Sequence, residues 1–160
     1  MIASHAVELA APRFEHGPER KIAGFGERYL YTAIENIPAL WYRFGPHIGK
    51  VPGQIGVITY GVCSNGDDAG FDYLAGVEVA TFLGLDERFR TILVPAAPYA
   101  VFSHSGHVSS LHQTFEAIWG KWLLDSGRRF AATPVFERYG EGFEPDSGSG
   151  GIEIWCPLAA

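Results

Sequence analysis

The chain has 160 residues, of which 47% are hydrophobic and 19% charged, a globular composition that excludes a disordered chain. Its 12 basic and 18 acidic residues leave a formal net charge of -6, which argues against direct nucleic-acid binding through clustered Lys and Arg. The length fits a single domain, 1–160, and no segment approaches the roughly 18 to 20 apolar residues of a membrane span, so we expect a cytoplasmic protein without membrane contact.

In chain order, each half of the sequence reads as strand, strand or extended run, helix and hairpin. In the first half we predict a strand over 6–14 ended by the turn-forming residues 15–19, an extended segment over 20–31, a helix over 36–49, and a hairpin of strands 54–62 and 71–82 around the turn 63–70. In the second half we predict an extended run over 89–106 with a proline-marked break, a helix over 107–127, and a final hairpin of 134–143 and 151–158.

Both predicted helices carry an apolar stripe, for which core packing is the simplest explanation. In the first helix Asn36 suits the N-cap and Pro38 the first turn, whereas Pro46 disturbs the last turn. Gly127 is a natural end of the second helix. The stripes are formed by Ile37, Leu40, Trp41, Phe44 and Ile48 in the first helix and by Leu111, Phe115, Ile118, Trp119 and Trp122 in the second.

The two halves also match in sequence, at offsets of 75 to 79 residues. The matches, in order, are Ala23-Gly24-Phe25 with Ala100-Val101-Phe102, Ala39-Leu40-Trp41 with Ala117-Ile118-Trp119, Tyr60-Gly61 with Tyr139-Gly140, and Gly76-Val77-Glu78-Val79 with Gly151-Ile152-Glu153-Ile154. Four matches in the same order predict a duplicated strand-helix-strand-strand unit, with repeats at about 6–82 and 90–158. Two such units would share one antiparallel sheet with both helices on one face, an α+β fold.

The ordered stretches of the chain resemble the GyrI-like, or AraC-type effector-binding, domain from about Ala6 to the end. They read IPALWYRF, VPGQIGVITYGV, FDYLAGVEV, PYAVFSHSGHV, FEAIWGKWL, FERYG and GGIEIWCPL. The resemblance implies two modules around a pseudo-twofold axis and a groove, lined by aromatic rings, that binds small molecules and often lipophilic cations. Many relatives carry a helix-turn-helix DNA-binding domain. Only a short lead precedes the first expected strand, so we expect no such domain here and a resemblance to the stand-alone members.

The resemblance also implies which residues bind the ligand. It places the glutamate of the groove on the last strand, at Glu153. Residues two apart in a strand share a face, so Trp155 is expected beside Glu153, and the repeat makes Glu78 the corresponding carboxylate of the first half. The aromatic candidates are Trp41 and Trp119, paired by the repeat on the two helices, and Tyr60 and Tyr99 on strands, whose facing between pocket and core stays open.

The chemistry of such a site follows from burial. An ionised glutamate among apolar neighbours costs several kcal/mol unless it is paired or hydrated. A cationic ligand would provide that partner, and aromatic faces would add cation–π attraction of roughly 0.5 to 2 kcal/mol each. The competing interpretation is that Glu153 is an edge-strand charge that points into solvent and prevents aggregation.

The remaining reactive side chains suggest no further chemistry. Cys63 and Cys156 form no CxxC pair and are expected to be buried free thiols. His104, His107 and His112 lack a recognisable third-ligand arrangement, so we expect no metal and no cofactor.

The leading hypothesis is therefore a binding protein for cationic or amphipathic drug-like molecules, either a sensor or a sequestering protein. An enzyme of the same fold is the first alternative. It would hydrolyse a reactive cyclopropane-type natural product, with Glu153 as general base or as the group that orients water. A module that protects gyrase through protein contacts is the second. A homodimer through an edge strand or an apolar patch is possible under each hypothesis.

Overall fold

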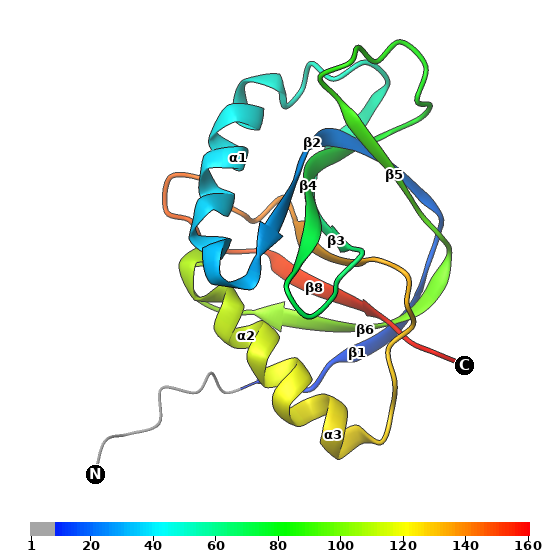
Figure 1. Ribbon diagram of the computed structural model, residues 1–160, viewed down its shortest axis with the longest axis vertical. Coiled ribbons are helices and arrows are strands. Elements are labelled where there is room, and N and C mark those ends of the chain that lie inside the picture. The colour runs from blue at the N-terminus through cyan, green and yellow to red at the C-terminus, as the bar shows by residue number, and fades with distance from the viewer. Residues whose placement is uncertain (1–8) are drawn as a thin grey trace.

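The computed structural model describes residues 9–160 and contains one antiparallel sheet of eight strands with its helices on one side (Figure 1). The strands are β1 Arg13–Gly17, β2 Arg20–Leu30, β3 Gln54–Ser64, β4 Gly70–Val79, β5 Arg90–Val94, β6 Ala97–His104, β7 Val135–Tyr139 and β8 Ile152–Pro157. The predicted α+β class is confirmed. Both predicted hairpins form, because β3 pairs with β4 and β7 pairs with β8 in antiparallel register.

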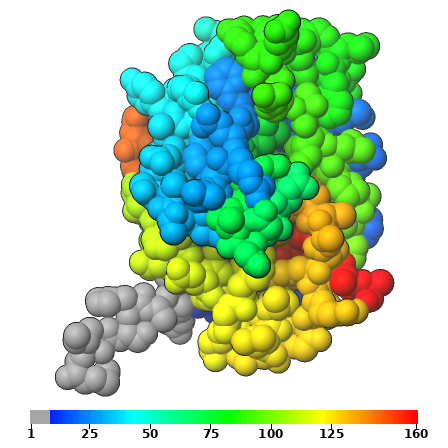
Figure 2. Space-filling model, in the orientation of Figure 1, coloured from blue at the N-terminus to red at the C-terminus, as the bar shows by residue number. Residues whose placement is uncertain are grey.

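Two helical regions cover the sheet, as predicted. The first is α1, Ile37–Phe44, which lies between the 3-10 segments Tyr31–Asn36 and Gly45–His47. The second runs from a 3-10 turn, Val108–Ser110, through α2, Leu111–Ala117, and a π-helical stretch, Ile118–Trp122, into α3, Leu123–Ser126. In the space-filling view α1 (cyan) lies in the upper part of the surface, and the segment of α2 and α3 (yellow) lies in the lower part (Figure 2).

The strand order is β1-β6-β8-β7-β3-β4-β2-β5. Inward from one edge, β1 is followed by β6, β8 and β7; inward from the other edge, β5 is followed by β2, β4 and β3. In both halves the last strand of the chain segment therefore lies between the other two, as β8 lies between β6 and β7 and β4 between β2 and β3. The edge strands are exchanged between the halves, since β1 precedes β2 in the chain but pairs with β6, and β5 precedes β6 but pairs with β2. This mirrored order is what a duplicated unit would produce. The repeat boundaries 6–82 and 90–158 remain our proposal.

Two local predictions are wrong. The first strand was expected over 6–14; residues 6–8 lie outside the described part, and β1 includes Glu15, His16 and Gly17, because their backbone pairs with β6 and this pairing overrides the turn propensity. Asn36 makes no side-chain cap, because the chain already enters α1 from a 3-10 turn. Gly127 ends the second helix in the left-handed conformation (φ 69°), as predicted.

The sheet curls, and it buries apolar side chains on both of its faces. The face toward the helices carries two clusters, one under α1 and one under α2, and Trp41 packs against both. The opposite, inner face of the curl holds a third cluster: Ile22, Tyr60, Val62, Leu74, Val94, Tyr99, Val101, Phe136 and Trp155. The sheet therefore separates two distinct interiors, and the face to which a strand residue points decides which interior it lines.

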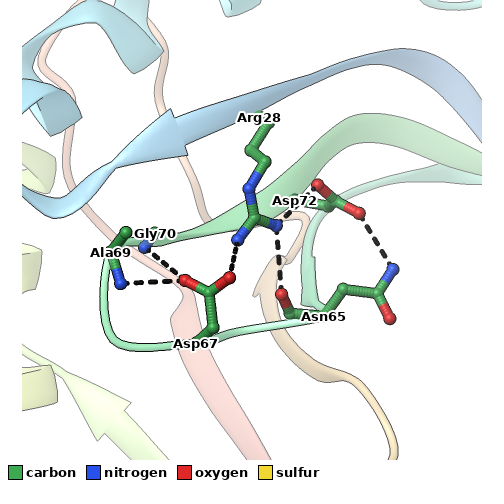
Figure 3. Close-up of polar contacts among 6 residues, drawn as sticks. All are labelled: Arg28, Asn65, Asp67, Ala69, Gly70 and Asp72. Carbon is green, nitrogen blue, oxygen red and sulfur yellow. Dashed lines mark hydrogen bonds and ion pairs between the residues drawn. The ribbon is translucent and has the colours of Figure 1, made fainter.

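A polar network fixes the turn between β3 and β4 (Figure 3). Arg28 on β2 donates to Asp67 at 2.6 Å, to Asp72 at 3.1 Å and to the backbone carbonyl of Asn65 at 3.1 Å. The Asp67 carboxylate also accepts two backbone N–H groups of the turn, each within 2.9 Å. These contacts are exposed and individually weak, but together they hold the start of β4 against β2.

Among the helices of residues 9–160, none is long and apolar enough to cross a bilayer.

Candidate functional site

A buried carboxylate, Glu137, lies under the two helices at the middle of the sheet. Alternation along β7 points Glu137 and Tyr139 toward the helices, whereas Phe136 and Arg138 point to the inner face. Strand β7 is one of the two central strands of the order, so Glu137 lies where the two halves meet. Its exposed fraction is only 7%.

Three aromatic side chains from three elements surround this carboxylate. The hydroxyls of Tyr73 and Tyr139 each donate a 2.7 Å hydrogen bond to Glu137 Oε1. The indole Nε1 of Trp41 on α1 donates to the Tyr73 hydroxyl at 2.9 Å, and the Trp41 ring meets the Tyr139 ring edge-on at 5.5 Å. Hydrogen bonds from Trp41 on α1 to Tyr73 and from Tyr73 to Glu137 therefore connect the two halves of the sheet.

The second oxygen of Glu137 is left unused. Within residues 9–160 no side chain or backbone group donates a hydrogen bond to Oε2 of Glu137. In the same range Thr133 Oγ1 is the one buried side-chain polar atom that has no partner and is also sealed from solvent. Oε2 of Glu137 does not belong to that class of atom, and within residues 9–160 its lone pairs are left free to accept from a ligand.

The ionisation of Glu137 is poised near neutrality. Burial raises its pKa to about 7, and the two tyrosine hydrogen bonds, which favour the carboxylate, offset this only in part. The pKa values of Tyr73 and Tyr139 lie well above the ordinary value, because burial and then the neighbouring Glu137 disfavour the phenolate. The phenols therefore stay protonated and act as donors to the carboxylate.

Glu153, the carboxylate that the sequence favoured, lies on the inner face and is already paired. Its Oε2 accepts a 2.7 Å bond from Arg13, its Oε1 accepts a 3.1 Å bond from the Trp155 indole, and Arg138 lies 3.7 Å away. Burial alone would raise its pKa, but the bonds from Arg13 and Trp155 outweigh burial and hold the pKa below the ordinary value. The charge of Glu153 is thus compensated within the protein.

A cavity of about 320 Å³ borders Glu153, with Ser103, His104, Arg138, Ile152 and four residues of the glycine-rich turn around it. Its lining carries Arg138 and the carboxylates of Glu141 and Glu153, but none of the Phe, Tyr or Trp rings that a lipophilic cation would contact. The cavity beside Glu153 therefore lacks the aromatic walls that a lipophilic cation would need.

The structure separates the other predicted site residues. Trp155, Tyr60 and Tyr99 belong to the inner cluster, and Glu78 faces the same side as its strand neighbour Leu74. Two strands, β7 and β3, lie between the strands of Glu153 and Glu78. Trp119 is 39% exposed and stacks on Phe115 of its own helix. We call Glu137 with Tyr73, Tyr139 and Trp41 the Glu137 group. Of the seven predicted residues, Trp41 is the one that belongs to this group.

Sequence reasoning missed Glu137, Tyr73 and Tyr139. The signal was present in FERYG, where a glutamate precedes a tyrosine by two residues in a strand, so both must share a face. The other reactive groups serve the structure: the buried His104 contacts Thr114 at 2.7 Å and the backbone carbonyl of His107 at 2.9 Å. Both cysteines are free, Cys156 buried and Cys63 half-buried, and burial raises the pKa of each thiol.

Comparison with known proteins shows the family to which the chain belongs. The family model of the GyrI-like small molecule binding domain matches residues 10–159. The chain belongs to the GyrI-like family. The transcriptional regulator BrlR of Pseudomonas aeruginosa is 30% identical over 136 residues, which are 83% of this chain and 50% of BrlR, so this GyrI-like chain spans about half of BrlR.

Solved structures share the GyrI-like fold at lower identity. The structure of SAV2435 bound to tetraphenylphosphonium matches with a TM-score of 0.75 at 20% identity, over 96% of this chain and 95% of SAV2435. The EcmrR C-terminal domain matches with a TM-score of 0.66 at 18% identity, over 96% of this chain and 99% of that domain. At such identities the likeness establishes the fold, and the family establishes small-molecule binding as its class of function.

Proposed function

We propose that this GyrI-like chain binds a lipophilic cation between the two helices and the sheet, with Glu137 as its counter-charge. The observation that carries the proposal is the unused Oε2 of a buried carboxylate that is surrounded by Trp41, Tyr73 and Tyr139. A buried charge without an ionic partner is costly, so a cation that arrives at this carboxylate removes an existing penalty. This proposal replaces Glu153 by Glu137 as the receptor.

The aromatic neighbours suit a flat or bulky apolar cation. Ring faces attract a desolvated cation by roughly 0.5 to 2 kcal/mol each, and indole is the strongest of them. SAV2435, which shares the fold, binds tetraphenylphosphonium, an aromatic cation without a hydrogen-bond donor. A ligand of that kind can use only charge and ring contacts, which are the contacts that the Glu137 group offers.

Entry of a ligand requires movement, because Glu137, Tyr73 and Tyr139 are at most 7% exposed. Trp41 covers the group from α1 and is itself half-buried, so a shift of α1 would open the site. The second helical region contains a π-helical stretch at Ile118–Trp122. Such stretches mark weak points of a helix and are frequent at functional sites, which makes this helix a second element able to move.

The experiment is a calorimetric titration with tetraphenylphosphonium at pH 8, carried out on the wild type and on two matched variants. Glu137→Gln should weaken binding on the order of tenfold or more, because a buried charge interaction is lost. Glu153→Gln, the same change on the opposite face, should leave affinity unchanged. Loss of binding in Glu153→Gln alone would return the site to the inner face. A reactive substrate converted beyond one equivalent per chain would favour the hydrolase alternative.

A further inference from the structure

The inner face of the curled sheet holds a buried positive charge, Arg20, at the start of β2. Its exposed fraction is 8%, and its guanidinium carbon lies 5.1 Å from the ring centroid of Phe136 and 5.0 Å from that of Trp155. The side chain therefore lies against rings of β7 and β8 in the inner cluster. Its one hydrogen bond within residues 9–160 is a long one, 3.4 Å, from Nη1 to the Pro18 carbonyl.

No carboxylate neutralises this charge in the part of the chain that the structure describes. The ion pairs within 4.0 Å there involve Arg13, Arg28, Arg43, Arg88, Arg138 and two lysines, and none involves Arg20. Arginines are seldom this buried without an anionic partner, because the lost hydration must be replaced. Aromatic faces replace part of it and leave the N–H groups unsatisfied.

Two sets of unused donors meet at Phe136. Nε and Nη2 of Arg20 and the hydroxyl of Tyr60 donate to no group of residues 9–160. Tyr60 is only 4% exposed, and its ring contacts the Phe136 ring edge-on at 5.6 Å. Within that range Thr133 Oγ1 is the one side-chain atom that is both sealed from solvent and unpaired, so these donors do not belong to that class. Both side chains are thus buried, and these donor atoms have no partner among residues 9–160.

The other charges of the inner face leave Arg20 unpaired. Arg13 lies over the same Trp155 ring, at 5.6 Å from its centroid, and Arg138 is on the same face of β7 as Phe136. The carboxylates of Glu153 and Glu15 are both paired with Arg13, at 2.7 and 2.8 Å. Glu78, which shares this face, lies opposite Ile22 and forms no ion pair with Arg20 within 4.0 Å. The guanidinium groups of Arg13, Arg20 and Arg138 and the carboxylates of Glu15, Glu78 and Glu153 therefore share this face, and Arg20 is the arginine among them without an ion pair within residues 9–160.

We propose that the inner face of the curled sheet is a second ligand site, which binds a small aromatic carboxylate through Arg20 and the Tyr60 hydroxyl. A carboxylate matches the planar fork of a guanidinium and accepts two parallel hydrogen bonds from it. The ring of the ligand would contact Phe136, Trp155 and Tyr99, which already pack on one another. Phe136 and Glu137 are adjacent on β7 and point to opposite faces, so this site is independent of the cation site.

The test uses benzoate as the probe and amide and indole NMR shifts as the readout. Benzoate should shift the Trp155 indole signal and the amides around Arg20 and Phe136 saturably. Arg20→Met should weaken this binding by about tenfold or more, and Tyr60→Phe should weaken it severalfold. Arg88→Met, which removes an exposed arginine paired with Asp86, is the matched control and should bind as wild type.

Several outcomes would overturn the proposal: no saturable shift in the wild type, equal affinity in Arg20→Met, or inorganic phosphate binding more tightly than benzoate with the same shifts. If Arg20→Met does not fold, Arg20→Lys keeps the charge without the planar fork and should still weaken benzoate. Tetraphenylphosphonium should bind Arg20→Met as it binds wild type. Failure of the cation site therefore cannot be mistaken for failure of the anion site.

Discussion

Tyr73 on β4 donates a 2.7 Å hydrogen bond to Glu137 on β7, although a whole strand, β3, lies between them. The residue of β3 directly between them is Gly61, which pairs with Glu137 on one side and Ala75 on the other. A Cβ at Gly61 would collide with the Tyr73 hydroxyl and with Glu137 Oε1. The missing side chain is what lets the two groups meet above the strand.

Gly61→Ala should therefore break this hydrogen bond and destabilise the fold by about 1 to 3 kcal/mol, the usual cost of overpacking a core. Urea denaturation of both proteins measures the change. Gly120→Ala is the control, because a Cβ there meets nothing within 4 Å. Alanine is also the better helix former, so Gly120→Ala should be neutral or stabilising by at most about 1 kcal/mol. Equal stability of Gly61→Ala and wild type would contradict the packing argument.

The stability of the protein should fall as pH rises between about 4.5 and 7. Glu137 has a folded pKa of about 7 against an ordinary value of 4.5, so the folded state holds its proton more tightly than the unfolded state. Its contribution is complete below pH 4.5 and is lost as pH rises through 7, a difference of about 3 kcal/mol. The pH dependence is measured as the free energy of unfolding in urea at pH 5 and pH 8.

Glu137→Gln isolates this contribution from those of all other titrating groups. The difference in stability between variant and wild type should change by about 2.5 kcal/mol from pH 5 to pH 8, in favour of the variant at high pH. The carboxylates with lowered pKa, such as Asp72 and Glu153, lose their contributions only as pH falls below this window. A constant difference between variant and wild type would show that Glu137 titrates normally.

Cation affinity should have the opposite pH dependence, because the ligand binds the ionised carboxylate. Binding of tetraphenylphosphonium should strengthen from pH 5 to pH 8 with a midpoint near the pKa of Glu137. Tyr73→Phe removes a hydrogen bond that favours the ionised form, so this midpoint should move to higher pH. Calorimetric titrations across this range measure both midpoints, and a midpoint that moves down in Tyr73→Phe would refute the assignment.

Much of the fold was predictable because its signals are local. The helices, both hairpins and the break at Pro95 follow from periodicity and turn residues, and the mirrored strand order agrees with the matched segments. The course of β1 was not predictable, since Glu15 to Gly17 extend only because β6 offers its edge. Pairing between distant segments decided that strand against its own turn propensity.

The site was harder to predict, because alternation shows which residues share a face but not which face meets the helices. Glu153 and Glu137 both follow the strand pattern, and the tertiary curl assigns them to opposite interiors. The ion pair that occupies Glu153 comes from Arg13, 140 residues away in the chain. No local pattern indicates such a partner, whereas the Glu-x-Tyr spacing of FERYG did indicate a shared face.

The two tryptophans that the repeat pairs should differ in their effect on ligand binding. Trp41 is bonded to Tyr73 and lies 5.5 Å from Tyr139, whereas Trp119 stacks on Phe115 and is 39% exposed. Trp41→Leu should weaken tetraphenylphosphonium binding by about 0.5 to 2 kcal/mol, the worth of one cation–π contact. Trp119→Leu removes the same ring from the corresponding position and should leave affinity unchanged. Equal losses in both variants would mean that the ligand contacts both helices symmetrically, and the Glu137 group would then be only one side of a larger site.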